Sequence, residues 1–277
     1  MLGCDVVTAA QQRGQEVLAL TRADLDITDV VAVRGVVRPG DVIVNCAGWT
    51  DVDRAESQEV AAARINAAGP GTLAAACQER GARLVHMSTD YVFSGTAKKP
   101  YPEDAPLAPR SAYGRSKAAG ERAVRELLPD AGFIVRTAWL YGEHGRNFVS
   151  TMMRLERSQE TVDVVDDQRG QPTWTRDVAA RVLDVVELDP APGTYHATSS
   201  DETTWFGLAR AIFTAVGADP GRVRPATTSS VLRPAPRPAY SVLGHDAWGR
   251  VGLEPLRNWE AALEEAVPEL RASLAAS

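Results

Sequence analysis

Segments of strand length and segments of helix length alternate through the first half of the chain. The predicted strands cover residues 16–20, 41–48, 83–93 and 132–142. The first is expected to be short and buried, and the second, apolar and β-branched, to be buried on both faces. Because parallel strands are joined by long crossovers, usually helices, this alternation predicts an α/β fold with a doubly wound parallel sheet. Ligands of such sheets bind at the carboxyl ends of the strands.

Predicted helices separate these strands. The alanine-rich segment 57–81 is expected to be helical, with a break near 69–70 and an end at Gly81. A second helix is expected over 111–128, with Ser111 as its N-cap.

The chain opens directly on a helix. Leu2, Val6 and Ala10 recur at helical spacing, Gly14 ends the helix, and the strand 16–20 follows. In a parallel sheet such a helix normally joins two strands. Only the second of these two strands is found in the sequence.

The alternation loosens in the second half of the chain. We expect residues 1–146 to form a nucleotide-binding domain, with 174–198 returning to it. Residues 147–277 are expected to form mainly a smaller, interleaved substrate-binding part. The proline-rich segment 233–244 is too apolar for a flexible linker, so we expect it to pack over a site.

Composition excludes several functional classes. A net charge of −6 and a pI near 5.4 argue against nucleic-acid binding as the main function. No apolar run reaches membrane-spanning length, and the N-terminus does not resemble a signal peptide. The three cysteines lack metal-ligand spacing, which predicts reduced core thiols, no metal site and a cytoplasmic setting.

The pair Tyr113 and Lys117 is the main candidate for chemistry. At a spacing of four residues on a helix, the two side chains lie on one face. An ammonium group near a phenol favours the phenolate and lowers the phenol pKa toward neutral pH, which suits proton exchange in carbonyl reduction. A chance pair on a solvated helix is the alternative. Thr89 ends the preceding predicted strand and could hydrogen-bond the same substrate oxygen, although simple capping of the strand end by Ser88 and Thr89 is also open.

Two further strand ends suit a dinucleotide. Residues 45–53 begin with small side chains, which would let a flat ligand approach the backbone. Arg22 follows the strand 16–20, where Rossmann-like folds discriminate the adenosine ribose, and an arginine there suits a 2′-phosphate. An ordinary surface arginine is the alternative.

Together these features resemble the extended short-chain dehydrogenase/reductase superfamily and, within it, the dTDP-4-dehydrorhamnose reductase family. The resemblance runs nearly end to end and rests on "LDITD", "VIVNCAGWTDVDRAES", "STDYVFSG", "YGRSKAAGE", "VRTAWLYG", "NFVSTMMRL", "VVDDQRGQPTW" and "RPAYSVL". In the related sugar-nucleotide dehydratases an Asp-Glu pair stands where this chain has Asp90 and Tyr91, so the second carboxylate that dehydration needs is missing here.

The resemblance implies a role for each candidate residue. It implies reduction of the C4 ketone of dTDP-4-dehydro-L-rhamnose by NADPH, with NADH also open, in dTDP-rhamnose biosynthesis. Tyr113 would protonate the developing alkoxide, Lys117 would lower the Tyr113 pKa and hold the nicotinamide ribose, and Thr89 would polarise the carbonyl. The expected substrate-binding residues are Thr89, Asp90, Tyr91, Trp139, Asn147, Phe148 and Arg237. The expected cofactor-binding residues are Met1, Leu2, Gly3, Thr21, Arg22, Asp26, Ile27, Ala47, Gly48, Trp49, Thr50, Tyr113 and Lys117.

The resemblance also addresses the helix at the start. In related reductases a short apolar strand leads into a G-x-x-G-x-x-G turn, and "MLG" matches the end of that turn. We therefore expect the chain to lack the first strand of the fold, through a miscalled start codon or a true truncation. The neighbouring strands would then face unpaired N–H and C=O groups.

Two rival functions stay open at this stage. The regulatory subunit of methionine adenosyltransferase has the same fold and works as a binding partner, but it has no need of Thr89, Tyr113 and Lys117. The second rival is a reductase or epimerase of another nucleotide sugar. The expected partner is a small nucleotide-sugar substrate, with no nucleic acid and no membrane, and the protein is expected to be a monomer or a homodimer.

Overall fold

The computed structural model describes residues 1–276 and is built around a parallel sheet. The sheet has the order β1 (Val42–Asn45), β2 (Arg83–Thr89), β3 (Gly132–Thr137) and β8 (Gly193–His196). All three pairings are parallel, and Thr89 at the end of β2 lies in register with Thr137 at the end of β3. The carboxyl ends of the two central strands therefore meet at one edge of the sheet.

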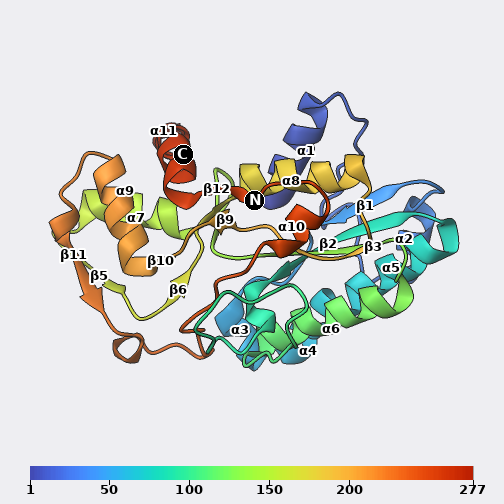
Figure 1. Cartoon of the computed structure of the whole chain (residues 1–277), viewed down its shortest axis with the longest axis horizontal. Coiled ribbons are helices and arrows are strands. Elements are labelled where there is room, and N and C mark those ends of the chain that lie inside the picture. The colour runs from blue at the N-terminus through green and yellow to red at the C-terminus, as the bar shows by residue number, and fades with distance from the viewer. Residues whose placement is uncertain (277) are drawn as a thin grey trace.

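Helices cover both faces of this sheet (Figure 1). On one face α1 (Leu2–Gln12) and α8 (Thr175–Leu188) pack against Val85 and Val135 of the central strands. On the other face α2 (Val30–Val36), α5 (Gly69–Arg80) and α6 (Ala112–Leu127) pack against Leu84 and Ile134. Neighbouring residues of a strand thus point to opposite cores. The expected α/β, doubly wound Rossmann-like fold is confirmed.

The expected strand at 16–20 is wrong. The segment makes no strand pairing in the described chain, and Leu18 and Leu20 are 73% and 42% exposed. The neighbouring β1 is the edge of the sheet, and Val42 to Val44 are only half-buried, so the expectation that this strand is buried on both faces is also wrong. Both expectations depended on a further strand that would pair with the segment 16–20 on one side and with β1 on the other. Residues 1–276 contain no strand before β1.

The long alanine-rich helix is irregular one turn earlier than expected. It consists of α4 (Glu59–Ala63), a π-helical turn η1 (Arg64–Ala68) and α5. The break expected near 69–70 is wrong, because Pro70 sits in the first turn of α5, where a missing N–H is tolerated. Gly81 ends α5 in the left-handed region, with φ of 64°, as expected.

A second core lies beside the sheet, on the left in Figure 1. It is formed by α7 (Phe148–Ser158), α9 (Trp205–Ala215) and α11 (Trp259–Ala276). Short strand pairs connect it: β5 (Val162–Val165) with β11 (Val223–Ala226), β6 (Arg169–Gly170) with β10 (Thr203–Thr204), β4 (Leu140–Tyr141) with β7 (Thr173–Trp174), and β9 (Ser199–Ser200) with β12 (Leu256–Asn258). The remaining elements are α3 (Val52–Ser57), η2 (Asp90–Val92), η3 (Pro220–Arg222), η4 (Thr228–Ser230) and α10 (Asp246–Arg250).

The order of these elements alternates between the two cores. After α7, the chain returns to the sheet through α8 and β8 before it forms α9. The domain limits expected from the sequence, 1–146 with 174–198 and then 147–277, stay a prediction.

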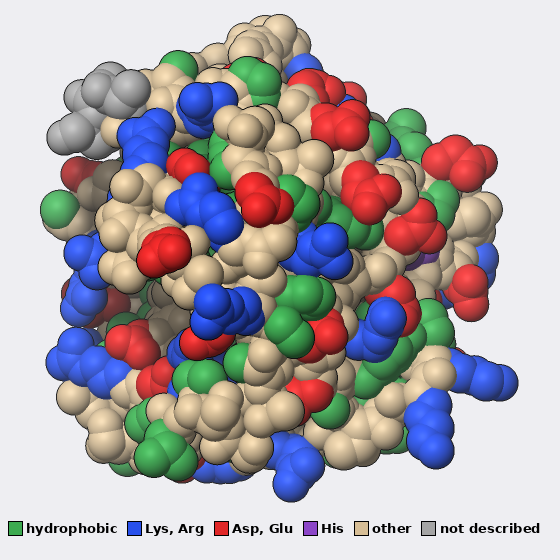
Figure 2. Space-filling view, turned by 90° about the vertical axis from the view of Figure 1, so that its left-hand side faces the viewer, with side chains coloured by type: hydrophobic (Ala, Val, Ile, Leu, Met, Phe, Trp, Pro, Cys, Tyr) green, Lys and Arg blue, Asp and Glu red, His purple; other side chains and the backbone are tan. Residues whose placement is uncertain are grey.

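The surface at one end of the molecule carries charges of both signs. Figure 2 shows the end of the molecule that lies on the left in Figure 1, where basic and acidic side chains are interspersed. No helix among residues 1–276 is long and apolar enough to cross a membrane.

Candidate active site

Thr89, Tyr113 and Lys117 are brought together at the carboxyl end of β2. Thr89 is the last residue of β2, and the other two side chains lie on the first turns of α6. Ser111 caps α6, as predicted, by accepting a hydrogen bond from the Gly114 N–H at 3.0 Å. A Cβ at Gly114 would clash with the carbonyl oxygen of Tyr91, so this glycine lets α6 approach the strand end.

Burial controls the titration of the two α6 side chains. It raises the pKa of Tyr113 to about 12, with a hydrogen bond to Thr89 opposing the rise and Asp90 adding to it. Burial lowers the pKa of Lys117 to about 8, and Glu121 opposes this fall. The Lys117 Nζ donates to the Met87 carbonyl oxygen at 2.6 Å. Burial is the dominant influence on the Tyr113 pKa here, and the expectation that Lys117 lowers it stays a prediction.

Asp90 and Tyr91 follow directly after β2. Asp90 is buried, and its Oδ1 accepts a hydrogen bond from the Thr89 hydroxyl at 2.9 Å. Burial raises the Asp90 pKa to about 6, although hydrogen bonds with Ser241 and Thr89 favour the ionised form. The Tyr91 ring meets the Tyr113 ring edge to face, with 5.5 Å between centroids. These contacts fix the position of the Tyr113 phenol.

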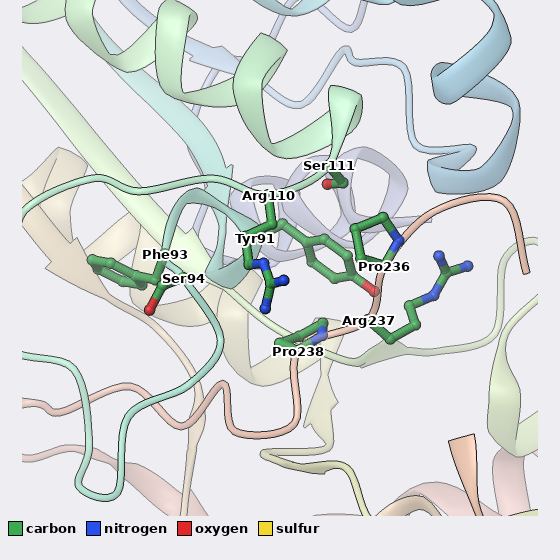
Figure 3. A pocket seen from close by; sticks show the side chains of 8 residues that line it. All are labelled: Tyr91, Phe93, Ser94, Arg110, Ser111, Pro236, Arg237 and Pro238. Carbon is green, nitrogen blue, oxygen red and sulfur yellow. The ribbon is translucent and has the colours of Figure 1, made fainter. Parts of the chain in front are cut away.

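The proline-rich segment packs beside Tyr91 and narrows a small pocket there (Figure 3). The pocket is lined by Tyr91, Phe93, Ser94, Arg110, Ser111, Pro236, Arg237 and Pro238. Arg237 extends away from the Tyr91 ring, and its Nη2 donates to Asp53 Oδ2 at 2.7 Å. Asp53 also accepts from the Ala235 N–H at 3.2 Å. Asp53, which the sequence did not suggest, thus ties this segment to α3.

Two of the expected cofactor-binding segments lie side by side at the sheet edge. A Cβ at Gly3, in the first turn of α1, would lie 3.5 Å from Cys46 Cβ, just after β1. Met1 and Leu2 precede Gly3, and Ala47, Gly48 and Thr50 are exposed beyond Cys46. A Cβ at Gly48 would lie 3.2 Å from Asn66 Oδ1 and 4.0 Å from Lys117 Nζ, so the backbone at 48 lies close to both side chains.

Asn66 is a buried residue that the sequence analysis missed. Its Oδ1 accepts from the Trp49 N–H at 2.8 Å, and its Nδ2 donates to Trp49 O and to Ser116 Oγ, both at 3.0 Å. The residue lies in the π-helical turn η1, a feature that is frequent at functional sites. Asn66 thus fixes the loop after β1 against α6. An asparagine inside an alanine-rich helix was the available signal.

The expected ribose-discriminating segment is exposed. Arg22 has no hydrogen bond or ion pair with any residue in 1–276, although its charge helps to lower the pKa of Asp26. Thr21 is held by Asp24, at 2.6 Å between Oγ1 and Oδ2. Asp26 accepts from the Thr28 hydroxyl at 2.8 Å and pairs with Arg64 at 3.4 Å, and its hydrogen bonds with Thr28 lower its pKa. Ile27 packs against Gly69, where a Cβ would lie 2.5 Å from Ile27 Cδ1.

The remaining expected substrate residues lie where β3 passes into the second core. The strand expected over 132–142 is interrupted, because Trp139 adopts a φ of 47° between β3 and β4. Asn147 caps α7 and donates to Gly142 O at 2.8 Å, so its side chain has a local structural role. Phe148 packs against Trp205, with 4.6 Å between ring centroids.

Comparison with known proteins agrees with this geometry. A family model described as the RmlD substrate binding domain matches residues 1–272. The chain belongs to this family. A dTDP-4-keto-6-deoxy-D-glucose reductase from Streptomyces niveus is 54% identical, over 98% of this chain and 95% of its own length. A dTDP-4-dehydrorhamnose reductase from Streptomyces griseus is also 54% identical, over 98% and 91%.

A solved structure extends the comparison to the fold. The dTDP-4-dehydrorhamnose reductase from Bacillus anthracis, in complex with NADP, superposes with a TM-score of 0.92 at 37% identity, covering 97% of this chain and 95% of its own. The resemblance drawn from the motifs is thus confirmed, and with it the oxidoreductase class.

Proposed function

We propose that the protein reduces the C4 ketone of dTDP-4-dehydro-L-rhamnose to dTDP-L-rhamnose with NADPH. The observation that carries the proposal is the convergence of Thr89, Tyr113 and Lys117, all buried or nearly so, at the carboxyl end of β2. The 54% identity to a dTDP-4-dehydrorhamnose reductase supports the choice of substrate.

Tyr113 is the proton donor in this proposal. With a pKa near 12 it is fully protonated at neutral pH, which is the form that reduction requires, because the ketone oxygen becomes an alkoxide far more basic than a phenolate. Proton transfer from the phenol to that alkoxide is therefore downhill. The Thr89 hydroxyl, which donates to Asp90 Oδ1 in this structure, would donate instead to the same oxygen and stabilise the charge that develops there.

The residues around Lys117 fit a nicotinamide dinucleotide. When bound, NADPH supplies a hydride to C4 of the sugar. The exposed backbone of Ala47, Gly48 and Thr50 leaves room for a flat ligand beside Lys117. Lys117 would hold the nicotinamide ribose, and the unpaired guanidinium of Arg22 would bind the 2′-phosphate. The Bacillus anthracis relative was solved with NADP.

The sugar nucleotide would bind along the pocket beside Tyr91. Asp90 and Tyr91 would orient the sugar, and Arg237 would bind the diphosphate by exchanging Asp53 for the more highly charged group. Trp139 and Phe148 would supply apolar surface. Asn147 would contribute indirectly, because it caps α7 and so fixes where that helix begins.

A second candidate substrate is favoured by one observation. The Streptomyces niveus relative, named a dTDP-4-keto-6-deoxy-D-glucose reductase, is as similar to this chain as the rhamnose enzyme from Streptomyces griseus. That sugar carries the same C4 ketone on a ring that differs in stereochemistry. The same catalytic residues would reduce it.

The test is a reductase assay that follows loss of NADPH absorbance with each of the two dTDP-ketosugars. The proposal expects turnover of dTDP-4-dehydro-L-rhamnose, with a higher kcat/KM than for the other ketosugar. A higher kcat/KM for the glucose-configured sugar would favour the second candidate. Absence of turnover with either sugar would favour a non-enzymatic subunit of the same fold.

A further inference from the structure

Trp139 is held in a backbone conformation that tryptophan seldom adopts. Its φ is 47°, and only Asp189 and Asp201 share a positive φ among the described residues other than glycine. For a bulky side chain this left-handed conformation is strained, and it persists only where the surroundings enforce it. The groups that enforce it can be identified.

Trp205 covers one side of the Trp139 indole. The two rings stack with 3.5 Å between centroids and 8° between planes. Trp205 is the first residue of α9, which Thr204 caps by accepting from the Gly207 N–H at 3.0 Å. Phe148 packs against the Trp205 ring in turn. The position of Trp205 is therefore fixed independently of Trp139.

Gly170 bounds the same indole from another element. A Cβ on Gly170 would lie 2.7 Å from Trp139 Cζ2 and Nε1, closer than carbon atoms approach. Gly170 is in β6, whose partner β10 immediately precedes α9. Only glycine at 170 leaves room for the indole beside Trp205.

This arrangement lies next to the candidate catalytic residues. Thr137 pairs in register with Thr89, and Trp139 follows Thr137 by two residues. The Trp139 carbonyl oxygen accepts from the Thr173 N–H at 3.2 Å, which anchors the backbone there. The indole is only partly buried, so part of it stays accessible beside the end of the catalytic strands.

We propose that Trp205 is a positioning residue: with Gly170 it holds the strained Trp139 so that the indole contacts the sugar ring of the substrate. The inference rests on the proposed function for the identity of that substrate. No group on Trp205 contacts the reacting atoms. Its effect is on binding of the sugar nucleotide, through Trp139.

The test uses two variants that disturb Trp139 in different ways: Trp205→Leu removes the stacked ring, and Gly170→Ala places a methyl group where the indole lies. Phe206→Leu is the matched control, because Phe206 neighbours Trp205 on α9 and packs in the same core without stacking on Trp139. Each variant is assayed for KM of the dTDP-ketosugar, KM of NADPH and kcat. Far-ultraviolet circular dichroism without substrate reports the paired bands that two stacked indoles produce.

We expect both variants to lose the paired dichroism bands and to raise the sugar-nucleotide KM by about three- to tenfold, the range that loss of one aromatic pair gives. The KM for NADPH and kcat should change less than about twofold. Phe206→Leu should keep the bands and the wild-type KM.

Loss of the bands with an unchanged sugar-nucleotide KM would overturn the inference, because the stack would then be purely structural. An equal rise in KM for Phe206→Leu would also overturn it. Failure of the proposed function is recognised separately, since wild-type protein would then show the bands but no turnover of the dTDP-ketosugar.

Discussion

The substitution Glu121→Gln should strongly destabilise the protein, because Glu121 neutralises a buried arginine. The Glu121 carboxylate accepts from Arg136 Nε at 2.8 Å and from Arg136 Nη2 at 2.7 Å. It also accepts from Ser88 Oγ at 2.6 Å and from Arg125 Nη2 at 3.0 Å. The Glu121 and Arg136 side chains are 0% and 1% exposed.

The magnitude follows from this burial. A glutamine keeps the shape but loses the charge, and its NH₂ group meets N–H or O–H donors where a carboxylate oxygen had accepted. Breaking a buried ion pair on one side costs about 3–5 kcal/mol, because the other charge stays buried without a partner. Set against a total stability of about 5–15 kcal/mol, this is a large loss.

Urea unfolding followed by circular dichroism measures the effect, with Glu126→Gln as the control. Glu126 lies on the same helix, is exposed and has no hydrogen bond or ion pair with any described residue, so this change should alter stability by less than about 0.5 kcal/mol. A loss below about 1 kcal/mol for Glu121→Gln would refute the reasoning and show that the site tolerates an unpaired Arg136.

Two further predictions concern the cofactor and pH. Arg22→Ala should weaken NADPH binding by about 1.5–3 kcal/mol and leave NADH binding nearly unchanged in a fluorescence titration, and equal losses for both would show that Arg22 does not bind the 2′-phosphate. Burial lowers the pKa of His196 to about 3 and of His245 to about 4, so their contribution to stability is full above the unfolded pKa of about 6.5 and is lost as pH falls through the folded values. The urea midpoint should therefore fall between about pH 7 and about pH 4, and a constant midpoint would contradict neutral burial of these histidines.

The helix that carries Tyr113 and Lys117 could be predicted from the sequence. Ser111 is a good N-cap, and the spacing of Tyr113 and Lys117 fixes them on one face of any helix. What the spacing could not show is where the lysine points. Its ammonium group donates to the carbonyl of Met87, on a strand 30 residues earlier, and that contact depends on tertiary packing.

Two strand predictions failed because contacts distant in the sequence decide whether a segment forms a strand. The segment 16–20 has the composition of a strand, but a strand forms only against a hydrogen-bonded neighbour, and none is present for it in residues 1–276. The predicted strand at 132–142 failed for a different reason. Trp139 takes a left-handed conformation because Gly170 and Trp205, distant in sequence, enforce it.

Two site residues were invisible for the same physical reason. Asn66 acts through a π-helical turn that periodicity does not reveal, and it bonds Trp49 and Ser116 from there. Asp53 meets Arg237 across 184 residues of sequence. Both sets of contacts join elements that are distant in the sequence, and such packing is not encoded in any local pattern.

The most direct test of the proposed reaction is the activity of Tyr113→Phe. Phenylalanine keeps the ring that packs against Tyr91 and removes only the hydroxyl that would protonate the alkoxide. The measurement is kcat with NADPH and dTDP-4-dehydro-L-rhamnose, alongside NADPH binding by titration. The account predicts a fall in kcat of at least about 10²-fold with NADPH affinity within about threefold of wild type. Wild-type kcat in Tyr113→Phe would contradict it.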